Sequence, residues 1–99
     1  MGNGKDIAQF MDQAKGDPRI GPLHISLYVA IYSCWIRQGG GQVVEVSAKE
    51  LKDLAKISGG TPFYRRLKQL HKYGYLVYEP SFNPVVRSRV MLPVSVVID

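Results

Sequence analysis

The sequence predicts a single small α+β domain that is mainly helical. Its 99 residues suffice for one hydrophobic core, since single cores usually take about 50 to 200 residues. With 45% hydrophobic and 21% charged residues, the chain is too apolar to remain disordered. Two patterns give the class. Four segments repeat apolar residues at helical spacing, and short β-branched runs lie between the second and third segments and near the C-terminus.

The first helix is expected over Lys5–Lys15 and makes residues 1–16 an N-terminal helical arm. Its apolar stripe consists of Ile7, Phe10, Met11 and Ala14. This stripe needs an apolar surface to pack against, and the sequence leaves two possibilities. We favour a homodimer built from this helix. The alternative is that the helix folds back and completes the core of a small monomer, against Tyr28, Tyr32 and Trp35.

The second helix opens at Pro22, because proline is favoured at a first helical position. Its apolar stripe consists of Leu23, Leu27, Ala30, Ile31 and Cys34. Three consecutive glycines at 39–41 end this helix. The segment Gln42–Val46 follows as a short strand, because it is rich in β-branched residues and is bounded by turn residues.

The next two helices are expected to form a helix-turn-helix motif. Ser47 and Glu50 match a capping box, in which each side chain accepts a hydrogen bond from an unpaired backbone N–H. This helix must end by Ser58-Gly59-Gly60, and Thr61 and Pro62 restart a helix with a capping hydroxyl and a first-turn proline. The restarted helix is expected over Pro62–Tyr73. Two helices joined by so tight a turn are typical of helix-turn-helix.

A β-hairpin is expected after Gly74. Its strands are Tyr75–Tyr78 and Val90–Ile98, and the turn-rich residues 80–84 lie between them. Because Pro93 cannot donate a ladder hydrogen bond, pairing should break there, and residues 93–99 should form a C-terminal edge segment.

Positive charge is concentrated in the second half of the chain. Residues 61–99 carry six Lys and Arg against two Asp and Glu, so a polyanionic partner is indicated. On the helix Pro62–Tyr73, the outward face combines cations with hydroxyl and amide groups that can contact phosphates and base edges. The candidate DNA-binding residues are Lys49, Thr61, Tyr64, Arg65, Arg66, Lys68, Gln69, Lys72, Arg87 and Arg89.

Each part of this set also has a structural explanation. Surface helices are generally charged on their outward face, so the helical residues alone do not establish a DNA contact. Arg87 and Arg89 recur at strand spacing and should share one face, from which they can reach the DNA backbone or minor groove. Charges on a hairpin can instead protect a sheet edge from association.

Several residues together carry a resemblance to a known superfamily. They are Ser47, Leu51, Leu54-Ala55, Ile57-Ser58, Thr61, Tyr64-Arg65-Arg66-Leu67, Leu70 and Tyr73-Gly74-Tyr75-Leu76. With these residues the chain resembles winged helix-turn-helix DNA-binding proteins. With residues 23–30 and Trp35 it is most similar to small ones from bacterial conjugative transposons and related mobile elements.

The resemblance covers roughly Pro22 to Met91, so residues 22–92 are taken as the winged-helix core. It implies that residues 62–73 are the recognition helix in the major groove, and that residues 80–89 are a wing on the backbone or minor groove. The chain departs from the usual pattern at Gly59-Gly60, which makes a looser turn, and at Pro62.

The sequence contains little support for an enzyme, a metal or cofactor site, or a membrane protein. His24 and Cys34, ten positions apart on one predicted helix, are about 15 Å apart along its axis, too far for a catalytic dyad. We expect no enzymatic activity, metal, cofactor or small-molecule substrate. The longest uncharged run, Ile20 to Ile36, is too short and broken to span a membrane. The lone Cys34 and the lack of an apolar leader make the cytoplasm the expected location.

Sequence-specific binding of double-stranded DNA is therefore the predicted function. The protein would act as a transcriptional regulator or as a recombination or replication accessory factor. The alternative is a winged-helix protein-interaction module without direct DNA binding, whose partner surface would consist of Tyr64, Tyr75, Tyr78 and Phe82.

Overall fold

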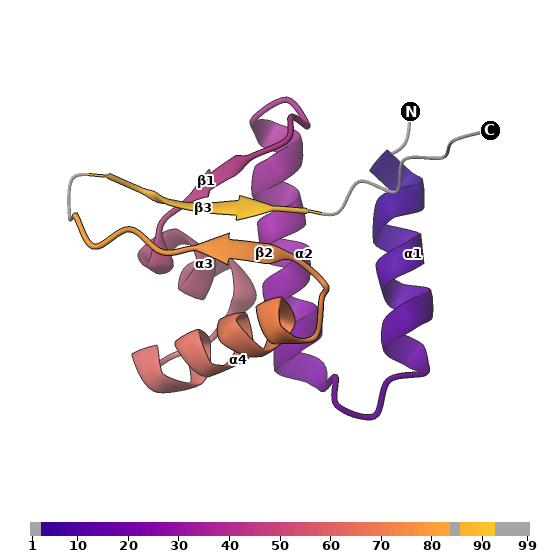
Figure 1. Ribbon diagram of the computed structural model, residues 1–99. Helices are drawn as coiled ribbons and strands as arrows, with labels where there is room; N and C mark the ends of the chain where they lie inside the picture. The colour runs from indigo at the N-terminus through magenta and orange to yellow at the C-terminus, as the bar shows by residue number, and fades with distance from the viewer. Residues whose placement is uncertain (1–2, 84–85, 93–99) are drawn as a thin grey trace.

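Four helices and a three-stranded antiparallel sheet make up the domain, as a computed structural model of the chain describes it (Figure 1). The description covers residues 3–83 and 86–92, with side chains from residue 7 onward. The elements in order are α1 (Asn3–Lys15), α2 (Pro22–Arg37), β1 (Val44–Val46), α3 (Ala48–Ala55), α4 (Gly60–Lys72), β2 (Val77–Glu79) and β3 (Ser88–Met91). The predicted mainly helical α+β class is confirmed.

The sheet has the order β1-β3-β2, so the last strand lies between the other two. Val90 of β3 is fully buried and pairs with Val44 on one side and Tyr78 on the other. The antiparallel hairpin is confirmed with shifted strands. β2 is Val77–Glu79 and not Tyr75–Tyr78, and β3 begins at Ser88, two residues before the predicted start, and ends at Met91. The predicted break at Pro93 and the edge segment 93–99 lie outside the described residues.

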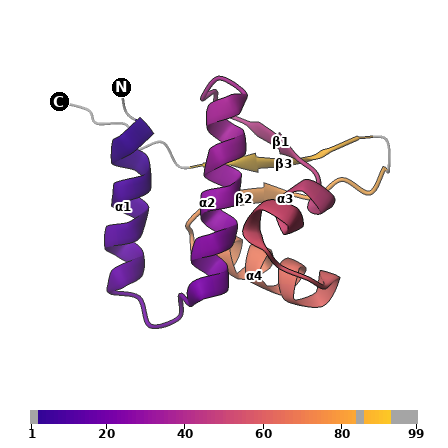
Figure 2. The same cartoon turned by 180° about the vertical axis from the view of Figure 1, so that it is seen from behind.

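Helix α2 is the centre of the fold. Leu27 and Ile31 are completely buried, and the sheet, α3 and α4 pack on one side of α2 while α1 packs on the other (Figures 1 and 2). The α2 start at Pro22 agrees with the sequence prediction. No described helix is long and apolar enough to cross a membrane.

Helix α1 belongs to the core. The ring of Phe10 is 3% exposed and stacks on that of Tyr28, with 3.7 Å between ring centroids and 2° between planes. Its edge meets Tyr75 at 5.4 Å, and Ala14 is also buried. Of the two interpretations of this stripe, the second therefore holds: α1 folds back on α2 and completes the core. Phe10 and Ala14 of the stripe are buried within the domain, and the homodimer stays a prediction.

The turn between α3 and α4 differs from the prediction. Helix α4 begins at Gly60, two residues before the expected start, so Thr61 is inside the first turn and does not cap the helix. Gly59 takes the capping position with φ +156°, where a Cβ atom would come within 3.3 Å of Pro62 Cδ. Pro62 is tolerated because N–H groups in the first turn have no intrahelical partner.

The start of α3 carries only half of the predicted capping box. Ser47 Oγ accepts a hydrogen bond from the Glu50 N–H at 3.1 Å. The Glu50 carboxylate instead lies between two guanidinium groups, 3.6 Å from Arg37 and 3.5 Å from Arg87. The Glu50 side chain thus points toward the end of α2 and the residue that precedes β3.

Candidate nucleic-acid interface

A stripe of exposed polar and cationic side chains runs along α4. At about 100° per residue these side chains fall opposite Phe63, Leu67 and Leu70, which are buried against the core. The stripe extends about 17 Å at 1.5 Å per residue. We call it the α4 stripe, and its members are Thr61, Tyr64, Arg65, Lys68 and Lys72, all exposed.

The three cations of the α4 stripe are electrostatically free within the described part of the chain. Arg65, Lys68 and Lys72 form no ion pair there, whereas the four salt bridges seen involve other arginines. An unpaired cation on a surface helix keeps its full attraction for an anion, because no neighbouring carboxylate competes for it. This helix face can therefore bind a polyanion without first breaking contacts.

Two other predicted contact residues of α4, Arg66 and Gln69, are half-buried and bonded to each other. Gln69 Oε1 accepts hydrogen bonds from His24 Nε2 at 2.6 Å and from Arg66 at 3.1 Å. The other ring nitrogen of His24, Nδ1, accepts from the Gly21 N–H at 2.9 Å, which fixes the neutral ring as the Nε2–H tautomer. His24 is buried. Gln69 thus links α4 to α2 through the bond of its Oε1 atom to His24, and its role as a DNA contact stays a prediction.

The hairpin arginines are exposed but already paired. Arg87 contacts Glu50 of α3 at 3.5 Å, and Arg89 contacts Glu79 of β2 at 3.8 Å, with just over half of each arginine side chain accessible. Exposed pairs this long contribute little to stability and exchange partners readily. The two side chains reach different elements, and β3 is the central strand. Protection of a sheet edge therefore does not explain Arg89.

The remaining predicted residue, Lys49, lies apart from the α4 stripe. It is exposed on α3 and lines a shallow hollow with Glu50, Asp53 and Arg87. Two carboxylates beside it give this region mixed charge. Lys49 is therefore a weaker candidate for a phosphate contact than the lysines of α4.

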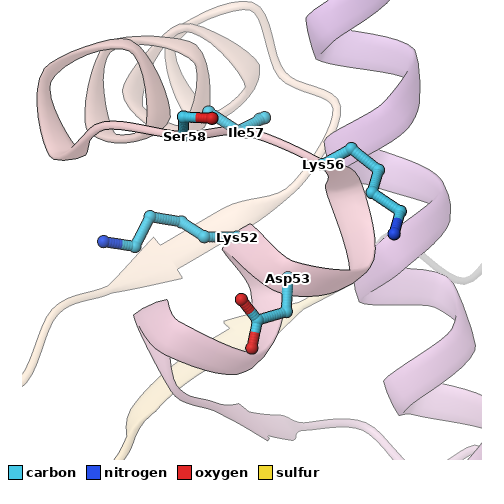
Figure 3. Close-up of a pocket in the computed structure, with 5 residues that line it drawn as sticks. All are labelled: Lys52, Asp53, Lys56, Ile57 and Ser58. Carbon is cyan, nitrogen blue, oxygen red and sulfur yellow. The ribbon is translucent and has the colours of Figure 1, made fainter.

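Sequence reasoning did not consider two further cations, beside the α3–α4 turn. Lys52 and Lys56 line a hollow together with Asp53, Ile57 and Ser58 (Figure 3). Figure 3 shows the two lysine side chains extending in different directions, so they do not converge on one point. The backbone of Lys56, which caps the end of α3, is in the left-handed conformation with φ 61°. These residues add positive charge to the turn without forming an anion site.

A polar cluster ties the α1–α2 connection to the start of the hairpin. Arg19 makes two side-chain hydrogen bonds to the Asp17 carboxylate, at 2.8 and 2.9 Å, and its guanidinium lies over the Tyr73 ring. The Tyr75 hydroxyl donates to Asp17 Oδ2 at 2.7 Å. Hydrogen bonds from Arg19 and then Tyr75 hold the pKa of Asp17 well below its usual range. Burial and the bond to Asp17 raise the pKa of Tyr75 to about 12.

This cluster was missed because nothing in the local sequence joins residues 17 and 75. Arg19 is basic, but its guanidinium is already engaged within this cluster, so we do not include it among the candidate DNA contacts. Its guanidinium is held between a carboxylate and an aromatic ring.

Comparison with known proteins gives no family assignment: no protein-family model matches the sequence, and no curated protein or solved structure matches it. The function of the chain therefore has to be inferred from the placement of its charges and elements.

Proposed function

We propose that this protein binds double-stranded DNA as a winged helix-turn-helix domain. In this proposal α3 and α4 are the helix-turn-helix, α4 enters the major groove, and the β2–β3 hairpin is the wing. The order of elements from α2 to β3 and the strand order β1-β3-β2 support it. The protein would serve as a transcriptional regulator or as a recombination or replication accessory factor.

The α4 stripe is the observation that carries the proposal. Helix α4 has 13 residues and is about 20 Å long, and a major groove about 12 Å wide admits such a helix. Arg65, Lys68 and Lys72 lie along one side of it without carboxylate partners among the described residues. Lys68 and Lys72 would neutralise phosphates and release condensed counterions, which is the main sequence-independent source of DNA affinity. Arg65, near the start of the helix, would contact a base edge.

The placement of the hairpin also supports DNA binding. The beginning of α4 and the far end of the β2–β3 hairpin project toward the same end of the molecule, away from α1, in both views (Figures 1 and 2). A duplex lying across that end could meet both. Arg87 and Arg89 would then exchange Glu50 and Glu79 for phosphates, at little cost because both pairs are long and exposed.

The protein-interaction alternative has less support. It requires an aromatic partner surface, but Tyr75 is buried and Tyr78 is half-buried. Only Tyr64 and Phe82 of that set are exposed, and Tyr64 belongs to the same helix as Arg65 and Lys68. The charge favours a nucleic acid over a protein partner.

Binding to duplex DNA as a function of salt tests the proposal. Selection from a random-sequence duplex pool would provide the probe, and the logarithm of the affinity would be plotted against the logarithm of salt concentration. Phosphate contacts from Lys68 and Lys72 give a slope of about −1.8, and contacts from Arg87 and Arg89 as well would bring it to about −3.6. Lys68→Ala should reduce the magnitude of the slope by about 0.9.

The matched control is Lys15→Ala, which removes an exposed lysine from α1, on the opposite side of the molecule. This variant should bind with almost the wild-type slope. Failure to select any duplex, a flat salt response, or equal effects of the two lysine substitutions would refute the proposal.

A further inference from the structure

An aromatic ring stands almost entirely in solvent on the β2–β3 hairpin. Phe82 is 92% exposed, and no other large apolar residue of the described chain is as exposed. Tyr64, by comparison, rests its ring edge against Phe63, with 4.9 Å between ring centroids. A phenyl ring has no polar group that benefits from water, and this ring contributes nothing to the buried core of the domain.

The backbone on either side of Phe82 is held in place. The Ser81 N–H donates to Ser88 Oγ across the hairpin at 3.2 Å. The Ser81 hydroxyl also bridges to the backbone of Asn83, donating to its carbonyl oxygen at 3.2 Å and accepting from its N–H at 3.3 Å. The ring is therefore presented from a hydrogen-bonded turn. This pre-organisation lowers the entropy lost when the ring enters a binding partner.

The surroundings of Phe82 combine apolar and positive groups. Val86 is also exposed, and Arg87 and Arg89 follow it where the chain enters β3. Residues 80–88 contain no Asp or Glu. An apolar projection flanked by cations complements a partner with an anionic surface and an apolar interior. Double-stranded DNA has both, in its phosphates and its stacked bases.

We propose that Phe82 is an apolar wedge that inserts between two base pairs from the minor groove and kinks the duplex. This inference rests on the proposed DNA binding and adds a residue and a mode of contact to it. Side chains that act in this way partly unstack one base step and bend the duplex by about 20–90° toward the major groove. A bend in that direction would bring the DNA toward α4, whose beginning projects toward the same end of the molecule as the hairpin.

Measurement of DNA bending separates the wedge from ordinary phosphate contact. The selected duplex would carry a donor and an acceptor dye at its ends, and a fluorescent base analogue would be placed in turn at each step. Wild-type protein should shorten the end-to-end distance and brighten the analogue at one step. Phe82→Ala should abolish both signals and weaken binding about fivefold or more, as expected for loss of one aromatic–base contact.

Two further variants control the experiment. Phe82→Leu keeps an apolar wedge and should retain most of the bend. Val29→Ala removes a half-exposed apolar side chain from α2 and should leave bending and affinity unchanged. The salt slope of Phe82→Ala should equal that of wild type, because no charge is removed.

The outcomes distinguish the two proposals. If wild type binds with the expected salt slope but does not bend the duplex, or if Phe82→Ala bends it equally, the wedge is wrong and DNA binding by α4 stands. If wild type binds no duplex, both proposals fail. If the bend persists in Phe82→Ala but is lost in Lys68→Ala, bending comes from charge neutralisation by α4, and the wedge is again wrong.

Discussion

Replacing Phe10 by Ala would test whether α1 is an integral part of the domain. The ring is buried between Tyr28, at 3.7 Å, and Tyr75, at 5.4 Å, and these contacts join α1 to α2 and to the start of the hairpin. Phe→Ala in a core costs about 3–5 kcal/mol, including the cavity that remains. Because α1 is terminal and can shift to close part of the cavity, we expect a value near the lower end, about 3 kcal/mol.

A loss of this size is a large fraction of the stability of a domain of this length, about 5–15 kcal/mol. Urea unfolding followed by the fluorescence of Trp35 would measure it. With an m-value of about 1–3 kcal/mol/M, the midpoint should fall by about 1–3 M. Met11→Ala is the matched control. Met11 is the next residue on the same helix but is 41% exposed, so its loss should change the free energy of unfolding by less than about 1 kcal/mol.

The reasoning would be refuted if Phe10→Ala cost less than about 1 kcal/mol, or if deletion of residues 1–16 left the urea midpoint unchanged. Either result would make α1 a detached arm. Light scattering on the same samples would then show whether the freed stripe joins two copies, as the sequence first suggested.

Three other predictions concern the interface and the clusters behind it. Arg65→Ala should cost about 1–3 kcal/mol on a selected duplex and less on random DNA, whereas Lys72→Ala should weaken both equally; competition binding checks this. Gln69→Ala should cost about 1–3 kcal/mol of stability in urea unfolding, because it leaves the buried imidazole of α2 without its acceptor. Tyr75 should ionise near pH 12. Its folded pKa exceeds the ordinary value of 10.0, so the contribution of Tyr75 to the free energy of unfolding should be fully present below pH 10 and should be lost as the pH rises toward 12. Tyrosinate absorbance and urea unfolding at a series of pH values would measure this. Asp17→Ala should move that ionisation to lower pH.

The helical part of the fold was predictable because it depends on local signals. Proline after glycine at the start of α2 and the Ser47 cap of α3 act within one helical turn, and the structure retains both. The start of α4 was not predictable to the residue. Thr61 and Gly59 are both acceptable caps, and the choice of Gly59 depends on a backbone angle that the packing of the two helices sets.

The candidate interface was predicted only in part, for a similar reason. Arg65, Lys68 and Lys72 follow from helical periodicity, which places them opposite the buried leucines. Gln69 lies only slightly farther around the helix, so periodicity could not tell whether it faces solvent or α2. The contact with His24, 45 positions away, decided that it faces inward.

By itself, the amino-acid sequence determined the helices, the hairpin, the excess of positive charge and its position on one helix, because each depends on residues a few positions apart. Only the tertiary structure decided which charges are free. Glu50 is held by arginines from two other elements, and Asp17 by a tyrosine 58 positions away, while the α4 cations have no such partner in the described chain. It also decided that α1 is core. An apolar stripe shows that a helix needs a partner, but which partner depends on the shape and exposed area that the rest of the chain leaves for it.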